Sequence, residues 1–185
     1  MKPAGLAPPL TEQAQDIQDV WNGFLIASLV VGVLVVGAIF YVIIRFRRRG
    51  AGLPVQRREH IPIEVAYTVV PFLIVCVLFG VTWVSLDKVD ATTPDPDLTV
   101  VVTGFQWQWQ FDYPASGARV TGSDAVEPEL VLPAGESVRF ELKSLDVIHS
   151  FWIPGFRFKR DMFPGQTQTF DVDIGERTGS WPDIA

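Results

Sequence analysis

The chain has 185 residues, 48% of them hydrophobic and 19% charged, and carries a formal net charge of −6. This length allows one domain, or a small domain together with a membrane anchor. The single cysteine, Cys76, excludes an internal disulfide and a metal site built on a cysteine pair. The acidic balance argues against nucleic acid as a partner, because negative surfaces repel phosphates.

Two stretches of the sequence contain no charged residue, Trp21–Ile44 and Val65–Leu86. At about 1.5 Å per residue, helices of this length measure roughly 33–36 Å, enough to cross a hydrocarbon core of about 30 Å. Both runs are therefore predicted to be transmembrane helices. They would form a hairpin through the lipid bilayer over residues 21–86.

The distribution of arginines predicts the topology of this hairpin. The linker Arg45–Glu64 contains six arginines, whereas the first 20 residues contain one basic side chain, Lys2. The positive-inside rule then puts the linker in the cytoplasm. The segment 1–20 and everything after Leu86 would lie on the outer side of the cell membrane.

After Leu86 the composition becomes that of an all-β domain. A proline-containing linker, 87–97, precedes short runs rich in β-branched and aromatic residues, and Ser137–Lys143 alternates apolar and charged side chains as a half-buried strand does. These features predict a sandwich or barrel over 98–185. The expected strands are Leu98–Thr103, Phe105–Phe111, Glu129–Leu132, Ser137–Lys143 and Gln166–Asp173.

From Asp87 onward the chain has 16 acidic and 8 basic side chains, a net charge of −8. Such a surface attracts basic proteins and accelerates their encounter at low salt. The alternative is a solvated surface that only keeps the domain soluble.

One aromatic run stands out, Gly104–Phe111. In a continuous strand Phe105, Trp107, Trp109 and Phe111 would project from one face. Four such rings would make a hydrophobic core. Alternatively, one indole reaches the surface and provides a docking contact or an electron route.

His149 lies in the most apolar part of the domain, within Asp146–Pro154. A lone histidine there is either a hydrogen-bonded structural residue or a metal ligand. A stable metal site needs three or four donors. The other histidine, His60, is predicted on the opposite side of the membrane, and only Met162, a weak thioether ligand, could join His149.

Glu64 is expected at the cytoplasmic end of the second helix. A carboxylate at a membrane boundary can admit protons. It can equally be an N-terminal charge that stabilises the helix dipole.

Five segments in this order resemble subunit II of cytochrome c oxidases, the haem–copper respiratory oxidases. Apart from the two apolar helices, they are Ile61–Glu64 at the start of the second helix, Val70-Pro71 inside it, Gly104–Trp109, Asp146–Phe151 and Lys159–Gly165. The similarity extends over nearly the whole chain.

This resemblance implies a cupredoxin fold for the outer domain and a dinuclear copper centre, CuA, that takes electrons from cytochrome c. It further implies that His149 is the first copper ligand and that electrons enter at Trp107, with Trp109 as its strand neighbour. Glu64 would be the carboxylate at the entrance of a proton pathway into subunit I. The implied partners are subunit I, which alone carries haem, the other oxidase subunits, cytochrome c and the bilayer.

The resemblance also has a gap. The family's other copper ligands lie on a Cys-x-Glu-x-Cys-x-x-x-His loop followed by a methionine, and this sequence ends about where that loop would begin. The chain is then either a fragment of a longer protein, with its β-domain incomplete, or a protein that has lost the copper site. Retention of His149 and the tryptophan pair favours a fragment. The rival functions are a copper-free, quinol-oxidase-like subunit and a membrane-anchored binding or assembly module.

Overall fold

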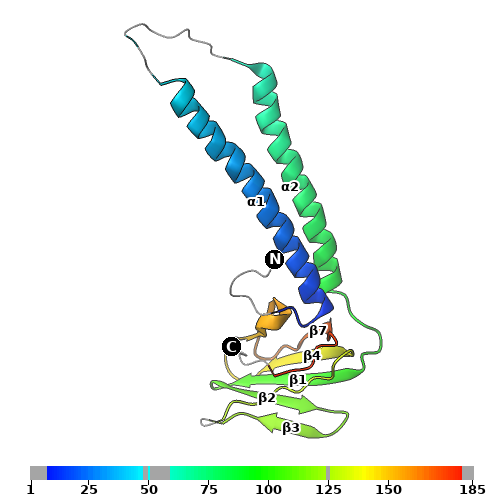
Figure 1. Ribbon diagram of the computed structural model, residues 1–185. Coiled ribbons are helices and arrows are strands. Elements are labelled where there is room, and N and C mark those ends of the chain that lie inside the picture. Colours follow the sequence, from blue (N-terminus) through cyan, green and yellow to red (C-terminus); the bar gives the residue numbers. More distant parts are fainter. Residues whose placement is uncertain (1–7, 48–49, 51–58, 124–125, 181–185) are drawn as a thin grey trace. The chain divides into compact units, whose positions relative to one another are not determined.

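The computed structural model describes residues 8–47, 50, 59–123 and 126–180 (Figure 1). Internal contacts divide the chain into two compact units. One contains residues 19–84, which form most of two long helices. The other combines the chain up to Gln18 with everything described from Ser85 onward, and it contains all the β-structure.

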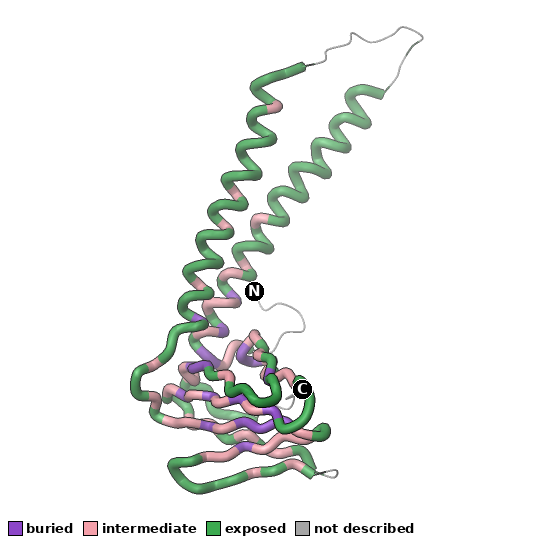
Figure 2. Tube along the Cα trace, turned by 180° about the vertical axis from the view of Figure 1, so that it is seen from behind, coloured by how far each residue is buried: buried purple, intermediate pink, exposed green. Residues whose placement is uncertain are grey.

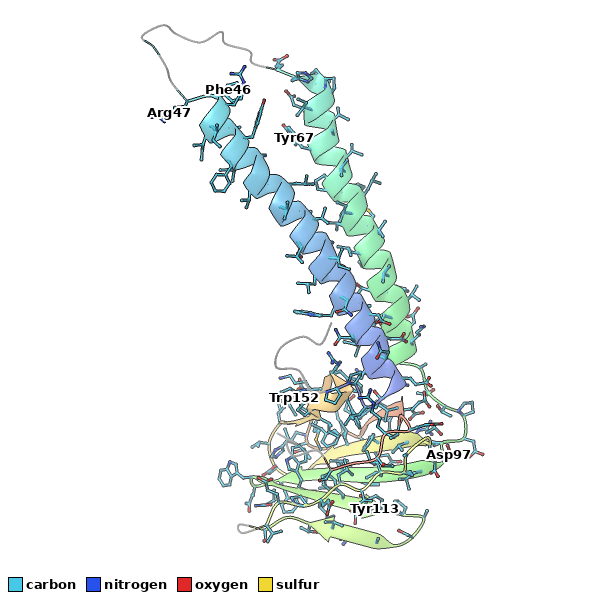
Figure 3. All side chains as sticks on the ribbon, viewed as in Figure 1. Phe46, Arg47, Tyr67, Asp97, Tyr113 and Trp152 are labelled. Carbon is cyan, nitrogen blue, oxygen red and sulfur yellow. The ribbon has the colours of Figure 1, made fainter. Side chains whose placement is uncertain are left out.

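The two helices are α1, Glu12–Arg45, and α2, Ile61–Val89, and each includes one of the predicted apolar runs. The most apolar part of each helix buries no residue within the chain, as the green helical tubes in Figure 2 show. Both are long and apolar enough to cross a membrane. Arg45 is the last residue of α1, and Phe46 and Arg47 follow it (Figure 3). The other four linker arginines, Arg48, Arg49, Arg57 and Arg58, lie outside the described residues.

The β-unit contains two sheets. Five strands form the larger sheet in the order β3-β2-β1-β4-β7, in which only the β1–β4 pair is parallel. An antiparallel pair, β5–β6, forms the smaller sheet, and a short 3-10 helix, η1, links its strands. The bounds are β1 Leu98–Phe105, β2 Gln108–Tyr113, β3 Ala118–Thr121, β4 Ser137–Ser144, β5 His149–Trp152, η1 Pro154–Phe156, β6 Lys159–Met162 and β7 Gln168–Asp173.

The core lies between these two sheets and follows the alternation of β4. Val138, Phe140 and Leu142 are fully buried. Figure 2 shows purple, buried stretches gathered in the β-unit. The Phe140 ring stacks on Phe170 of β7 with centroids 5.0 Å apart, and it meets Phe151 of β5 at 5.7 Å. Aromatic pairs at such distances stabilise beyond their burial. The predicted combination of two membrane-length helices with an all-β sandwich domain is confirmed.

Three details of the strand prediction were wrong. Phe105–Phe111 is not one strand, because the chain reverses at Gln106 and Trp107. Glu129–Leu132 forms no strand. The Val131 N–H donates to the side-chain oxygen Tyr113 Oη at 2.9 Å and not to the backbone of a neighbouring strand. The short strands β3, β5 and β6 were missed, because β5 and β6 do not alternate apolar and polar side chains and β3 does so over the minimum of four residues.

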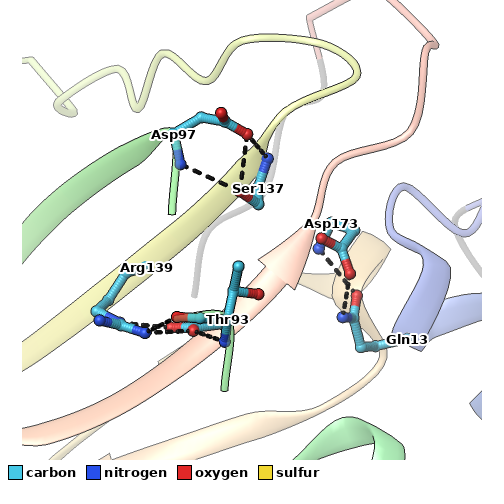
Figure 4. Close-up of polar contacts among 7 residues, drawn as sticks. Gln13, Thr93, Asp97, Ser137, Arg139 and Asp173 are labelled. Atoms are coloured by element: carbon cyan, nitrogen blue, oxygen red, sulfur yellow. Dashed lines mark hydrogen bonds and ion pairs between the residues drawn. The ribbon is translucent and has the colours of Figure 1, made fainter. Parts of the chain in front are cut away.

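The chain before α1 packs against the end of β7. Thr11 forms a bridge with Ile174, and its hydroxyl accepts the Ala14 N–H at 3.0 Å, which caps α1. The Gln13 side chain donates to the Asp173 carboxylate at 2.9 Å and accepts the Asp173 N–H at 3.0 Å (Figure 4). These bonds cover part of an edge strand that would otherwise present unpaired backbone groups.

Candidate functional site

Trp107 lies on the two-residue turn that joins β1 to β2. Phe105 pairs with Gln108, so Gln106 and Trp107 form the whole connection. Their φ angles are +36° and +67°, both in the left-handed region that disfavours residues with a Cβ. The Trp107 side chain is 92% exposed. The core placement expected for Trp107 in a continuous strand was therefore wrong, and the surface alternative is the observed one.

Trp109 and Phe111 follow the predicted alternation, because β2 is regular from Gln108 onward. Phe111 is fully buried and Trp109 packs against the core. The Trp109 ring contacts His149 edge-on at 6.1 Å between centroids and Phe151 at 5.7 Å. The two tryptophans thus differ in environment: Trp109 faces the aromatic core, and Trp107 faces solvent.

His149 begins β5, and its side chain is 17% exposed. Its ring lies over the backbone of Gly104 in β1, where an added Cβ would come within 3.1 Å of His149 Cγ. Such a contact is tight, and the imidazole would have to shift by a few tenths of an ångström to admit a side chain at position 104. His149 Nε2 is 2.6 Å from Asp146 Oδ1.

Asp146 connects these features, although the sequence analysis gave it no role. Its carboxylate accepts the Gln106 N–H at 2.8 Å and the Val147 N–H at 2.7 Å, besides the contact with His149. The Gln106 N–H, His149 and the Val147 N–H together lower the pKa of Asp146 to about 2. It is therefore ionised at neutral pH. A signal was present, since Asp146 lies only three residues before His149, and carboxylates commonly bond to a ring nitrogen of histidine.

The described residues do not form a metal site by themselves. They contain no group of three or more His, Cys, Asp or Glu side chains placed to hold an ion. Met162 is fully buried in β6 opposite His149, and Cys76 lies on α2. One imidazole is too few donors for copper, so a copper centre would need ligands beyond these residues.

Glu64 lies in the first turn of α2. Its carboxylate accepts the His60 N–H at 2.9 Å, while the His60 carbonyl accepts the N–H groups of Ile63 and Glu64. This reciprocal arrangement satisfies backbone groups that a helix start leaves without partners. The helix-stabilising alternative for Glu64 therefore has a geometric basis, and the proton-entry role remains a prediction.

Two membrane-length helices joined to a β-sandwich define a membrane-anchored β-domain protein. Comparison with known families is more specific. The family model for the transmembrane domain of cytochrome c oxidase subunit II matches residues 4–86, and that for its periplasmic domain matches 118–181. The chain belongs to the cytochrome c oxidase subunit II family, and α1 and α2 are its transmembrane helices.

Curated relatives agree with this assignment. A probable cytochrome c oxidase subunit 2 of Streptomyces avermitilis is 38% identical over 91% of this chain and 65% of its own length. Cytochrome c oxidase subunit 2 of Mycobacterium bovis is 31% identical over 89% of this chain and 60% of its own length. The chain thus spans less than two thirds of the length of these relatives.

Among solved structures, the chain is similar to the periplasmic domain of cytochrome oxidase subunit II (CoxB) of Bradyrhizobium japonicum. That match has 31% identity and a TM-score of 0.42, and it covers 48% of this chain and 70% of that one. The matched family ranges include Glu64 and His149, whereas Trp107 and Trp109 lie between the two ranges.

Proposed function

We propose that this chain acts as subunit II of a respiratory cytochrome c oxidase and receives electrons from cytochrome c at its β-domain. The observation that carries the proposal is the exposure of Trp107, which is 92% exposed on a strained turn. Asp146 joins this turn to His149, because its carboxylate accepts the Gln106 N–H and also contacts the imidazole. An exposed indole is costly to hold in this conformation, and strained residues cluster at functional sites. Trp107 would be the entry point, with Trp109 and His149 behind it.

The acidic character of the chain from Asp87 onward supports the proposal that the electron donor is a basic protein. Its excess of eight negative charges provides electrostatic attraction over the domain as a whole. Cytochrome c, subunit I with its haems, and the other oxidase subunits are the proposed partners. Oxygen reduction and proton translocation would belong to the assembled complex and not to this chain.

The proposed cofactor is a dinuclear copper centre with His149 as one ligand. The other ligands would come from outside the described residues. Metal analysis and electron paramagnetic resonance of the isolated complex test this. A complex that holds two more coppers than its His149→Ala variant, with a multiline signal that the substitution abolishes, would support the centre. Copper content and a spectrum that His149→Ala leaves unchanged would contradict it.

The topology proposed from the arginines keeps residues 45–64 in the cytoplasm and the segment 1–20, the linker 87–97 and the domain 98–185 outside. Protease added to intact spheroplasts tests this arrangement. Cleavage in the β-domain without cleavage in the 45–64 linker is the expected result. Cleavage confined to the linker would reverse the orientation.

For Glu64 we propose entry of protons toward subunit I in addition to the bond with the His60 N–H. Glu64→Gln separates the two roles, because an amide oxygen still accepts this hydrogen bond but cannot carry a proton. Slower proton uptake in Glu64→Gln, with a complex that assembles normally, is expected. Normal uptake would leave only the helix-stabilising role.

The function itself is tested by purifying the complex through a tag on this chain. Haem-containing subunit I should copurify, and the complex should oxidise reduced cytochrome c. Oxidation of a quinol but not of cytochrome c would favour the quinol-oxidase-like alternative. Recovery without any haem protein would favour a binding or assembly module.

A further inference from the structure

The turn that presents Trp107 lacks the residues that normally stabilise it. Two-residue hairpin turns with positive φ at both positions favour Asn-Gly, Asp-Gly or Gly-Gly, and this chain has Gln106 and Trp107. A residue with a Cβ is strained in the left-handed region, where its Cβ approaches the following carbonyl oxygen. Interactions from elsewhere in the chain must therefore hold this turn.

The β4–β5 loop provides those interactions through Asp146. Its carboxylate accepts the N–H of Gln106, the first strained residue, at 2.8 Å across 40 positions of sequence. The adjacent Leu145 N–H donates to the Gly104 carbonyl at 3.1 Å. The end of β1 and the start of the β4–β5 loop are thus joined at two points.

The same loop has little apolar burial of its own. Leu145, Val147 and Ile148 are all more than 60% exposed. The order of the loop therefore rests on hydrogen bonds, chiefly those of Asp146 to Gln106, Val147 and His149. One carboxylate fixes the turn, the loop and the imidazole together.

We propose that Asp146 is a positioning residue whose carboxylate holds the Gln106–Trp107 turn and so fixes the exposed indole relative to His149. Asp146 acts on the indole through the Gln106 N–H, which its carboxylate binds. The inference deepens the proposed function, because a rigid entry residue keeps a constant path to the groups behind it. Its structural part does not depend on electron transfer.

Hydrogen–deuterium exchange of the Gln106 amide tests this in the full chain in detergent micelles. Loss of a charge-assisted hydrogen bond in Asp146→Ala should speed exchange of this amide by about tenfold or more. Asp146→Asn keeps an oxygen acceptor and should remain within about threefold of the parent. Asp161→Ala removes an equal charge from β6, where Asp161 accepts the Ser150 hydroxyl, and should have no effect.

Fluorine resonance of 5-fluorotryptophan at position 107, assigned with Trp107→Phe, gives a second readout. In Asp146→Ala this resonance should sharpen and shift toward its value in the unfolded chain, while Asp161→Ala leaves it unchanged. Slow exchange of Phe140 and Leu142 amides in β4 shows that each variant is folded. Asp146→Leu, which has a similar shape but no acceptor oxygen, provides the test if Asp146→Ala fails that check.

Gln106 exchange and a Trp107 resonance that are unchanged in folded Asp146→Ala, or in folded Asp146→Leu in its place, would overturn the positioning role. An Asp146→Asn variant that exchanges as fast as Asp146→Ala would also overturn it. A normal rate of electron entry in Trp107→Ala would instead contradict the proposed function and leave the exchange result intact. The two failures are therefore distinguishable.

Discussion

Asp171 and Arg139 form the most enclosed ion pair of the β-domain. Asp171 on β7 is almost fully buried, and its carboxylate accepts two hydrogen bonds from the Arg139 guanidinium on β4, at 2.8 and 2.7 Å. It also accepts the Thr93 N–H at 2.6 Å, while Arg139 donates to the Thr93 carbonyl (Figure 4). Thr93 precedes β1, so this network anchors the segment that leads from α2 into the sheet.

Asp171→Ala should lower the free energy of unfolding of the β-domain by about 2 kcal/mol, since it leaves the Thr93 N–H and the Arg139 guanidinium without their acceptor. Urea denaturation of the full chain in detergent measures this. Glu141→Ala is the matched control, because Glu141 meets Lys143 at 3.5 Å on the exposed side of β4 and its loss should cost less than about 1 kcal/mol. Equal effects of the two substitutions would contradict the anchoring role.

At the scale of elements, the segment before α1 depends on a close approach to η1. The Leu10 N–H donates to the Gly155 carbonyl at 3.0 Å, and the Gly175 N–H donates to the Leu10 carbonyl at 2.8 Å. A Cβ on Gly155 would lie 2.4 Å from Leu10 Cδ1. Gly155 is therefore required for Leu10 to pack where it does.

Gly155→Ala should destabilise the β-domain by about 1–3 kcal/mol through this overpacking. Leu10→Ala should cost less and should relieve the clash. The double variant is then expected to be more stable than the sum of the two single effects predicts, as in a double-mutant cycle between contacting residues. Strict additivity in denaturation experiments would show that Leu10 does not occupy this position.

The strand prediction succeeded where local pattern decides the structure. In β4, Val138, Phe140 and Leu142 alternate with charged residues, and all three are buried. The prediction of one strand over the aromatic run Phe105–Phe111 failed, because no local sequence signal marks the turn at Gln106 and Trp107. Its hydrogen-bond acceptor, Asp146, lies 40 residues later, and a contact at that separation leaves no periodic trace in the sequence.

Individual functional residues were predicted from family resemblance more than from pattern. The position of His149 beside Trp109 depends on Gly104, which leaves space for the imidazole ring. It also depends on the register between β1 and β4, which joins residues far apart in the sequence and so leaves no local pattern. Likewise, the helix bounds exceed the charge-free runs, because Thr11 caps α1 and His60 begins the α2 bonding pattern.

For the whole molecule, several carboxyls link stability to pH. The N–H and hydroxyl of Ser137 lower the pKa of Asp97. Burial raises the pKa of Asp112 and Asp171, but hydrogen bonds, chiefly from Arg119 and Arg139 respectively, outweigh it and leave both below the ordinary value. These groups therefore bind fewer protons in the folded state than in the unfolded state.

This sign predicts an acid-sensitive β-domain. The stabilisation from lowered pKa values is fully present above the unfolded-state pKa of about 4 and is lost as the pH falls through the folded-state values. Urea midpoints of the full chain should hence fall between pH 5 and pH 2, and Asp171→Asn should reduce that fall. A midpoint independent of pH over this range would contradict the carboxylate interactions.

Transient kinetics test electron entry at the β-domain most directly. Electron transfer from photoreduced cytochrome c is followed in the oxidase complex that contains this chain. Trp107→Ala is compared with Trp152→Ala, which removes a second exposed indole, located on β5 (Figure 3). Because Trp107 makes little contact with the rest of the domain, its removal should leave folding and cytochrome c binding nearly unchanged. Entry should slow by at least roughly tenfold in Trp107→Ala only; equal rates in both variants would contradict the account.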